Sequence, residues 1–249
     1  VIWGLSGKSD LKLGVVAEGE RAGRLKQNGC RINGVTYRPQ VWTPKEAHGV
    51  DLLVVALKYG ALPGALESIR EVTGENTVIM SLMNGVDSEE LIAEKAGSSH
   101  MLYSLIKVAS HKEGEGYCFD PDTTIGIVFG ELSAPYDSDR VRAVEELFAD
   151  TGIHFRHTEH IREEIWSKFR LNVCNNLPAE CIIRVNYRLY NTSCVSSHSL
   201  CICKNQKDYE QMGGNCMRVS ICRIHGISFN KIIPVIISYS SIIIFFNSF

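Results

Sequence analysis

Two largely apolar runs, DLLVVAL at 51–57 and NTVIMSL at 76–82, limit the folds that are open to this chain. Apolar, β-branched runs of this length are typical of strands buried on both faces, as in the centre of a parallel sheet. A segment with helical spacing follows each run, at 62–72 and at 87–97. Strands therefore alternate with helices, and the sequence predicts an α/β fold with a mainly parallel sheet.

The alternation extends through the first 160 residues or so. Further strands are expected at 13–17, 101–109, 116–119, 124–130 and 153–157, and further helices at 18–29 and 137–152. Asn33-Gly34 is the two-residue turn signal of a β-hairpin. From about residue 160 the spacing becomes helical, and after Ala179 the chain contains no alanine. We therefore expect two domains, 1–158 and 159–249, with no reliable fold prediction beyond about residue 180.

Composition excludes several classes of protein. A formal net charge of -2 gives no basic field for nucleic acid. The N-terminal residues lack a signal peptide, so a cytoplasmic location is expected. The apolar run at 232–246 is shorter than a membrane span, so no membrane anchor is expected. His198, Cys201 and Cys203 lie close together without paired cysteine knuckles, so no metal site is expected.

A polar stripe interrupts the helical segment WSKFRLNVCNNLP at 166–178. Lys168, Asn172 and Asn176 are spaced i, i+4 and i+8, so on an α-helix they share one face. Apolar side chains supply the packing face: Trp166, Phe169, Leu171, Val173 and Cys174. A polar edge exposed to solvent is the plain alternative. However, asparagine weakens a helix, and an ammonium beside two carboxamides suits a substrate with a carbonyl oxygen and a carboxylate.

Lys58 and Asn84 directly follow the two buried runs. Both therefore lie at the carboxyl ends of parallel strands, where open α/β sheets form their ligand crevice. Gly85 adds a tight turn at which backbone can approach a ligand. On position alone, a solvated loop lysine and a turn-forming asparagine are equally good interpretations.

Four segments, in this order and at these distances, resemble the 2-dehydropantoate 2-reductase (ketopantoate reductase) family: DLLVVALKYG, SLMNGVDSEEL, VFGE and EEIWSKFRLNVCNN. AEGERAGRLKQNG and the INGVTY hairpin also resemble that family's second strand–helix unit and the chain that follows it. The resemblance runs from about Leu13 to Asn176, with a weaker match in VNYRLYNTS at 185–193. It implies a Rossmann-type domain followed by a helical domain, here incomplete, with the active site between them.

The resemblance also implies a reaction and its substrate contacts. The family reduces 2-dehydropantoate to pantoate with NADPH, a step in pantothenate and coenzyme A synthesis. Its catalytic lysine, the general acid for the new hydroxyl, falls on Lys168. Its substrate asparagines fall on Asn172 and Asn176, and along the weaker match a further one falls on Asn186. A homodimer is one assembly to expect.

Two cofactor contacts of the family fall on Lys58, near the nicotinamide, and on Asn84, which also contacts substrate. The family's glycine-rich cofactor turn is not recognisable, so we expect an N-terminally truncated chain with a divergent or frameshifted C-terminus. Glu18 stands where the family often has an arginine for the 2′-phosphate, which favours NAD, whereas Arg21 one turn later suits NADP. NADP is expected, with NAD as the alternative. Two alternative functions remain open: the chain is a non-catalytic remnant of such an enzyme, or it is a reductase of another 2-keto acid.

Overall fold

The computed structural model describes residues 1–176 and 242–247. The chain divides into two units, and each is described by itself. The first comprises Val1–Ile165 and Tyr239–Phe249, which includes the C-terminal strand β12 (Ile242–Asn247). The second comprises Trp166–Ser238.

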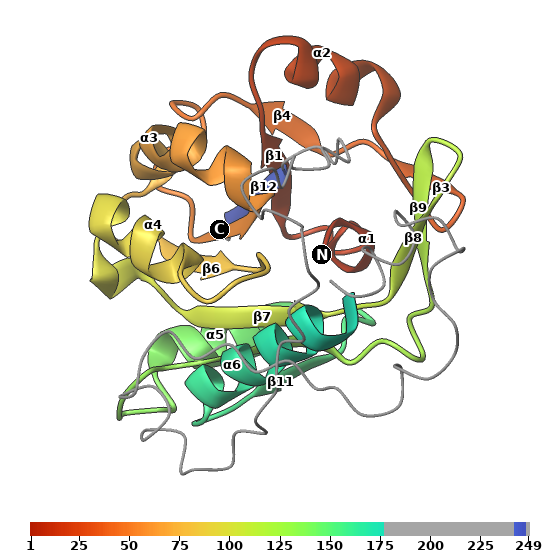
Figure 1. Cartoon of the computed structure of the whole chain (residues 1–249). Helices are drawn as coiled ribbons and strands as arrows, with labels where there is room; N and C mark the ends of the chain where they lie inside the picture. Colours follow the sequence, from red (N-terminus) through yellow and green to blue (C-terminus); the bar gives the residue numbers. More distant parts are fainter. Residues whose placement is uncertain (177–241, 248–249) are drawn as a thin grey trace, which may run out of the picture. The chain divides into compact units, whose positions relative to one another are not determined.

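The largest sheet has five strands in the order β4-β1-β12-β5-β6 (Figure 1). The strands other than β12 are β4 (Gln40–Trp42), β1 (Lys12–Val16), β5 (Leu52–Ala56) and β6 (Val78–Ser81). β4 is parallel to β1, and β5 is parallel to β6. β12 is antiparallel to both of its neighbours, β1 and β5. The prediction of a mainly parallel sheet is therefore confirmed, with one strand reversed at its centre.

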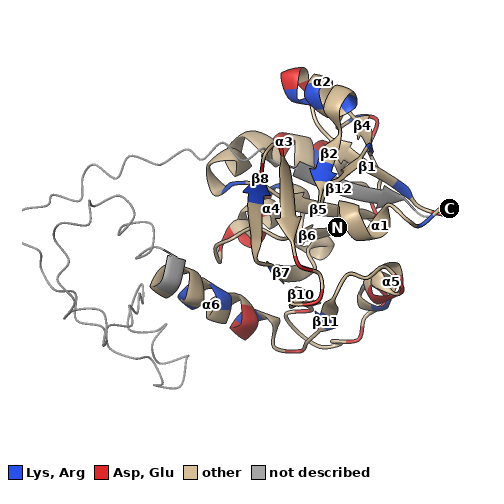
Figure 2. Ribbon diagram, turned by 90° about the vertical axis from the view of Figure 1, so that its right-hand side faces the viewer, with Lys and Arg blue, Asp and Glu red and all other residues tan. Residues whose placement is uncertain are grey.

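The position of β5 in the sheet explains why its residues form an uninterrupted apolar run. Leu52 and Val54 join a core cluster on one face of the sheet, with α1 (Ile2–Leu5) and α5 (Asp139–Phe148). Leu53 and Val55 join a cluster on the other face, with α3 (Leu62–Val72) and α4 (Ser88–Ala96). Since successive side chains of a strand point to opposite faces, both sets are buried only when both faces are covered. Figures 1 and 2 show the sheet between these helices.

The second sheet has three strands, in the order β11-β10-β7. Its strands are β7 (Tyr103–Lys107), β10 (Gly126–Gly130) and β11 (Phe155–His157). β10 is buried throughout, and Phe129 stacks against Phe155 with ring centroids 6.3 Å apart. The two glycines of β10 permit close approach of backbone, since an added Cβ at Gly126 would lie 1.8 Å from the His154 carbonyl oxygen.

The third sheet has the order β3-β2-β9-β8. Its strands are β2 (Cys30–Ile32), β3 (Val35–Tyr37), β8 (Ser110–Glu113) and β9 (Gly116–Phe119). Asn33 and Gly34 connect β2 to β3 with φ values of 48° and 78°. Two positive φ angles in a two-residue turn match the twist of the flanking strands, so the predicted hairpin is confirmed.

The polar stripe begins on α6 (Ile161–Leu171). Glu163 and Glu164 lie in its first turn and Lys168 and Arg170 in its last, which suits the helix dipole (Figure 2). From Asn172 to Asn176 the backbone is a π-helix, so the purely α-helical geometry predicted for this stretch is wrong.

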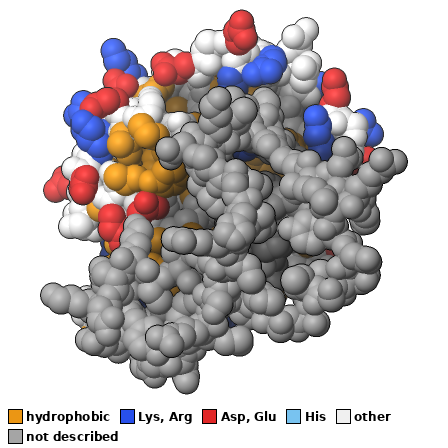
Figure 3. Space-filling model, viewed as in Figure 1, with side chains coloured by type: hydrophobic (Ala, Val, Ile, Leu, Met, Phe, Trp, Pro, Cys, Tyr) orange, Lys and Arg blue, Asp and Glu red, His pale blue; other side chains and the backbone are white. Residues whose placement is uncertain are grey.

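The remaining helices and strands of the first unit largely match the predicted ranges, including α2 (Gly19–Asn28). Among the described residues, two strands besides β12 and one α-helix are not predicted, namely β4, β8 and α1, and neither are the 3-10 helices η1 (Tyr59–Ala61) and η2 (Ser98–His100). Leu171, expected in the packing face of the last helix, is 53% exposed and is a correction to that prediction. No helix in the described part of the chain has the length and apolar character that crossing a membrane requires. On the face seen in Figure 3, described basic and acidic side chains are interspersed.

Candidate functional site

Lys58 lies just beyond the carboxyl end of β5. Leu57, between them, is buried, whereas Lys58 is exposed. Lys58 precedes a short 3-10 turn, η1 (Tyr59–Ala61), which leads into α3. Its backbone is extended, with φ -74° and ψ 144°, so the chain leaves the sheet at this residue before it turns.

Asn84 occupies the equivalent position after β6. It is exposed, and Gly85 has φ 124°, a conformation that side chains other than glycine rarely adopt. The hydroxyl of Tyr59 donates a hydrogen bond of 2.8 Å to Oδ2 of Asp87. This bond joins the turn after β5 to the turn after β6, and it raises the pKa of Tyr59 because the donor proton is held by a carboxylate. Since β5 and β6 are neighbours in the sheet, Lys58 and Asn84 belong to one edge of the first unit.

A buried polar network lies next to the Asn84 turn. The hydroxyls of Ser81 and Ser88 are 2.8 Å apart, and Ser88 donates to Oε2 of Glu89 at 2.7 Å. Ser104 donates to the Ser81 carbonyl oxygen at 2.8 Å, which ties the network to β7. Glu89 is 3% exposed, and burial raises its pKa to about 7. This network is not predicted from the sequence, although two serines that flank the asparagine turn are visible there.

Arg21 lies in the first turn of α2, which follows β1. It is half-buried, and its Nε and one terminal nitrogen are buried without a hydrogen-bond partner among the described residues. Burial lowers its pKa, while nearby Cys30 and Tyr117 act in the opposite direction. Glu18 precedes the helix, is exposed, and makes no capping hydrogen bond. The first turn of α2 therefore carries a half-buried arginine, and a guanidinium is a group that can bind phosphate.

The centre of the sheet does not fit the pyrophosphate of a dinucleotide. In the usual doubly wound order, a parallel strand occupies this position and leads through a glycine turn into a helix whose N-terminus holds the pyrophosphate. Here β12 occupies it in the opposite direction, with Ile242 opposite Ala56 and Ile243 opposite Val16 and Val55. Among residues 1–176 and 242–247, the carboxyl edge therefore has no strand–turn–helix cradle at the central position.

The polar stripe lies in the second unit. Lys168 and Asn172 are both half-buried, and they are one helical turn apart across the junction of α6 with the π-helix. Trp166 and Phe169 contact each other edge to face, with ring centroids 5.8 Å apart, and Val173 is buried. The backbone of Asn176 ends the π-helix, and Asn186 lies outside the described residues.

The structure thus gives two groups of predicted site residues. Lys58 and Asn84 share one edge of the first unit, and Arg21 follows another strand of the same sheet. A cavity of about 370 Å³ opens instead near the amino ends of β5 and β6, where Asp51, Val78 and Arg140 line it. Lys168 and Asn172 form the second group, on one helix.

Comparison with protein-family models gives one match. The model described as "Ketopantoate reductase PanE/ApbA" covers residues 3–132, which is more than half of the chain. That range includes Arg21, Lys58 and Asn84 and ends before α6 begins.

Two curated relatives illustrate the sequence similarity. An uncharacterised oxidoreductase of Bacillus subtilis, YkpB, is 25% identical over 154 residues, covering 60% of this chain and 50% of the relative. The 2-dehydropantoate 2-reductase of Aquifex aeolicus is 26% identical over 137 residues, covering 55% and 44%. The chain therefore spans about half the length of the curated relatives that it matches.

Solved structures show the same fold. A 2-dehydropantoate 2-reductase of Porphyromonas gingivalis aligns with a TM-score of 0.55 at 22% identity, covering 69% of this chain and 64% of that one. A D-mandelate dehydrogenase with NADH and anilino(oxo)acetate aligns with a TM-score of 0.53 at 16% identity, covering 63% and 52%. At these identities the likeness concerns the fold.

Proposed function

Because the chain belongs to the ketopantoate reductase family PanE/ApbA, we propose that it is an oxidoreductase that reduces the keto group of a 2-keto acid. Members of this family are NAD(P)-dependent oxidoreductases. The observation that carries the proposal for this chain is the pair Lys168 and Asn172 at the point where α6 becomes a π-helix. Single π-helical turns are rare and occur frequently at functional sites.

Helix geometry adds support for Lys168. Ile161 and Ile165 are buried on α6, and successive steps of four, three and four residues lead from Ile161 through Ile165 and Lys168 to Asn172. These residues share one face of a helix at 100° per residue. This face of α6 therefore carries buried apolar side chains at its start and an ammonium and a carboxamide at its end. An edge of the helix that is simply exposed to solvent would not begin with buried apolar side chains.

The chemistry of the proposed reaction needs both groups. Reduction of a carbonyl adds a hydride to carbon and a proton to oxygen. Lys168 is proposed as the general acid that gives its Nζ proton to the oxygen as negative charge develops there. Asn172 and Asn176 are proposed to hold the rest of the substrate through their amide groups. Asn186 is proposed as a further substrate contact.

Lys58, Asn84 and Arg21 are proposed as cofactor contacts, with Asn84 also touching substrate. A guanidinium at Arg21, which can bind a 2′-phosphate, is the reason for proposing NADP rather than NAD. The hydride is the cofactor's contribution. The described residues supply groups for its outer parts and lack the cradle for its pyrophosphate, so the cofactor site is only partly built in this structure.

The finer proposal names 2-dehydropantoate as the substrate, with (R)-pantoate as the product, in the synthesis of pantothenate and coenzyme A. It also includes a cytoplasmic location and assembly as a homodimer. 2-Dehydropantoate has the keto group and the carboxylate that the polar stripe suits.

Substitution of the proposed general acid tests the function. Lys168→Ala is expected to lower kcat with 2-dehydropantoate by about 10²–10⁴, the usual contribution of a general acid. Arg170→Ala is the matched control, because Arg170 is an exposed cation of the same helix turn. Wild-type turnover in Lys168→Ala, or an equal loss in Arg170→Ala, would refute the role of Lys168.

The second candidate is a non-catalytic remnant, and the reversed central strand favours it. If the whole chain, like its described residues, lacks a pyrophosphate cradle, it should not bind NADPH at micromolar concentration. Titration of the full chain with NADPH, followed by nucleotide fluorescence, separates the two. Saturable binding that weakens in Arg21→Ala supports the reductase, whereas no binding together with no turnover supports the remnant.

A third candidate keeps the fold and changes the substrate. The likeness to a D-mandelate dehydrogenase, solved with NADH and anilino(oxo)acetate, is the observation that favours it. Comparison of kcat/KM for 2-dehydropantoate with that for an aromatic 2-keto acid decides the point. A higher value for the aromatic acid would replace the proposed substrate.

A further inference from the structure

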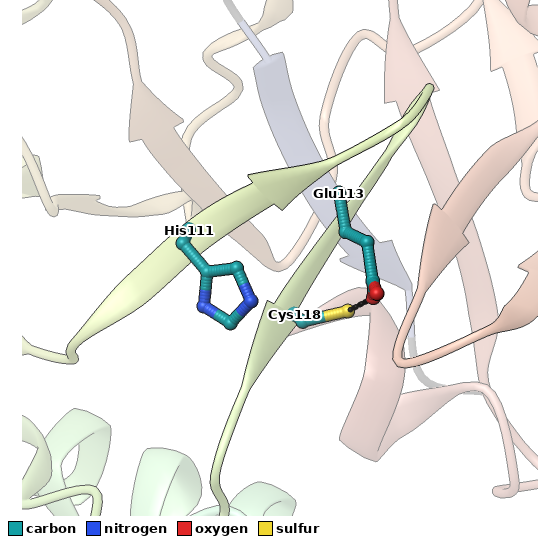
Figure 4. Close-up of side chains that lie close together, drawn as sticks. All are labelled: His111, Glu113 and Cys118. Atoms are coloured by element: carbon teal, nitrogen blue, oxygen red, sulfur yellow. Dashed lines mark hydrogen bonds between the residues drawn. The ribbon is translucent and has the colours of Figure 1, made fainter.

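The hairpin formed by β8 and β9 gathers three side chains that are common metal ligands. They are His111, Glu113 and Cys118, and Figure 4 shows them close together on adjacent strands. One ligand atom from each residue, a ring nitrogen, a carboxylate oxygen and the sulfur, all lie within 4.8 Å of one another. The group belongs to a different sheet from Lys58 and Asn84.

Strand register places the three side chains on one face. His111 is paired directly with Cys118, and Glu113 is two residues beyond His111 on the same strand. Directly paired residues share a face in an antiparallel ladder, and so do residues i and i+2. The residue opposite Glu113 is Gly116, which has no side chain to occupy the space beside the Glu113 carboxylate. An added Cβ at Gly116 would lie 3.0 Å from Arg31, so this corner is closed to larger residues.

We propose that this hairpin binds one zinc ion through His111, Glu113 and Cys118. An imidazole, a carboxylate and a thiolate are the three ligand types that Zn²⁺ takes in proteins, and the thiolate disfavours Mg²⁺ and Ca²⁺. Zinc bonds of about 2.0–2.3 Å put neighbouring tetrahedral ligand atoms about 3.5 Å apart. The exposed His111 and Glu113 side chains would have to rotate to reach that spacing, and water would take the fourth position.

The charges of the group suit a divalent cation. Cys118 donates its thiol hydrogen to Oε2 of Glu113 at 2.8 Å, a bond that raises the pKa of Cys118. Zinc replaces that proton: one Zn–S bond forms, the S–H bond breaks, and the proton passes to solvent. The thiolate and the carboxylate then balance the charge of the ion.

The inference is independent of the proposed reductase function, and it differs from the sequence-based expectation of no metal site. A bound ion would link the two strands of the hairpin close to its turn. The spacing H-x-E with a cysteine five residues later was visible in the sequence, but the hairpin register that joins the three was not.

Protection of Cys118 from alkylation tests the site. The full chain is treated with iodoacetamide under reducing conditions with and without Zn²⁺, and the tryptic peptide of residues 113–140 is quantified by mass spectrometry. Cys118 is the one cysteine in that peptide, so the cysteines from Cys174 onward do not contribute. Zinc is expected to slow modification of Cys118 by about tenfold or more, because a coordinated thiolate is shielded from the reagent.

Variants of the same hairpin identify the ligands. His111→Ala and Glu113→Gln should each lose most of the protection, whereas Lys112→Ala, on the other face of β8, should keep it. Because Lys112→Ala removes a tryptic site, Cys118 of that variant is followed in the peptide of residues 108–140. The peptide with Cys30 reports on non-specific effects, and its modification rate should not change with zinc. Two results would overturn the proposal: equal Cys118 rates with and without zinc in the wild type, or full protection in His111→Ala. Circular dichroism of each variant checks that the fold is retained.

Discussion

Glu89 is the residue at which burial and ionisation conflict most clearly. It lies in the first turn of α4, where the helix dipole favours a negative charge, yet its side chain is almost inaccessible to water. Desolvation is the largest effect, and the pKa rises from 4.5 to about 7. The carboxyl group is therefore about half protonated near neutral pH. It lies in the first turn of α4, shortly after the turn that carries Asn84.

This pKa shift predicts how stability depends on pH. Since the folded state binds the Glu89 proton more tightly than the unfolded chain, its contribution is fully present below pH 4.5 and is lost as the pH rises through about 7. The shift corresponds to a free energy on the order of 3 kcal/mol, at about 1.4 kcal/mol for each pKa unit. Glu89→Gln, which stays neutral, should flatten the fall between about pH 5 and about pH 8.

Urea unfolding at the two pH values measures this effect. Glu90→Gln is the control, because Glu90 is exposed in the same helix turn. An unchanged pH dependence in Glu89→Gln would show that another group titrates.

At the scale of elements, the sequence reports best on structure that local physics decides. The two apolar runs became β5 and β6 because a strand covered on both faces has few alternatives. Asn33-Gly34 became a hairpin turn because its residues tolerate positive φ. The sequence does not reveal which distant segment pairs with a strand, so the position of β12 and the His111–Cys118 pairing were not predicted.

In the candidate site, too, the features that local sequence determines were predicted and those that depend on packing were not. Lys58 and Asn84 were predicted to lie at one edge because the ends of parallel strands meet there, and the structure places them so. The stripe on α6 was predicted from α-helical spacing, which holds from Lys168 to Asn172 and then gives way to a π-helix. The buried network of Ser81, Ser88 and Glu89 depends on side-chain packing that periodicity does not report.

Gly126 supplies a prediction about β10. Its φ is 92°, and an added Cβ would lie 1.8 Å from the His154 carbonyl oxygen of the neighbouring chain segment. Gly126→Ala should lower the free energy of unfolding by about 2–4 kcal/mol, through strain and backbone displacement. Gly64→Ala is the control, because a Cβ there meets nothing within 4 Å and alanine favours the helix by about 1 kcal/mol. Equal stabilities of the two variants in urea would contradict this account.

At the scale of the whole molecule, β12 joins two halves of the main sheet. It pairs with β1 on one side and with β5 on the other, so without it the two parallel pairs share no direct ladder. The integrity of the first unit therefore depends on a short segment near the end of the chain.

Ile244 lies opposite Val15 on one side and Val54 on the other. Ile244→Pro should destabilise the sheet by about 3 kcal/mol or more, because proline removes a ladder hydrogen bond at a central strand. Ile244→Val should cost about 1 kcal/mol or less, because it keeps the backbone donor. Thermal unfolding of both variants measures the difference, and similar melting temperatures would show that β12 does not hold the sheet.

The position of β12 also has a consequence for synthesis on the ribosome. Val16 and Ile243 are register partners although more than 220 residues separate them in the chain. During translation, β1 and β5 emerge before β12, and each has an unpaired edge until the residues of β12 have also been made. Contacts of such long sequence separation form slowly, and open strand edges invite pairing with other nascent chains. Chaperone protection during translation is therefore expected to affect the yield of folded protein more than any single surface contact does.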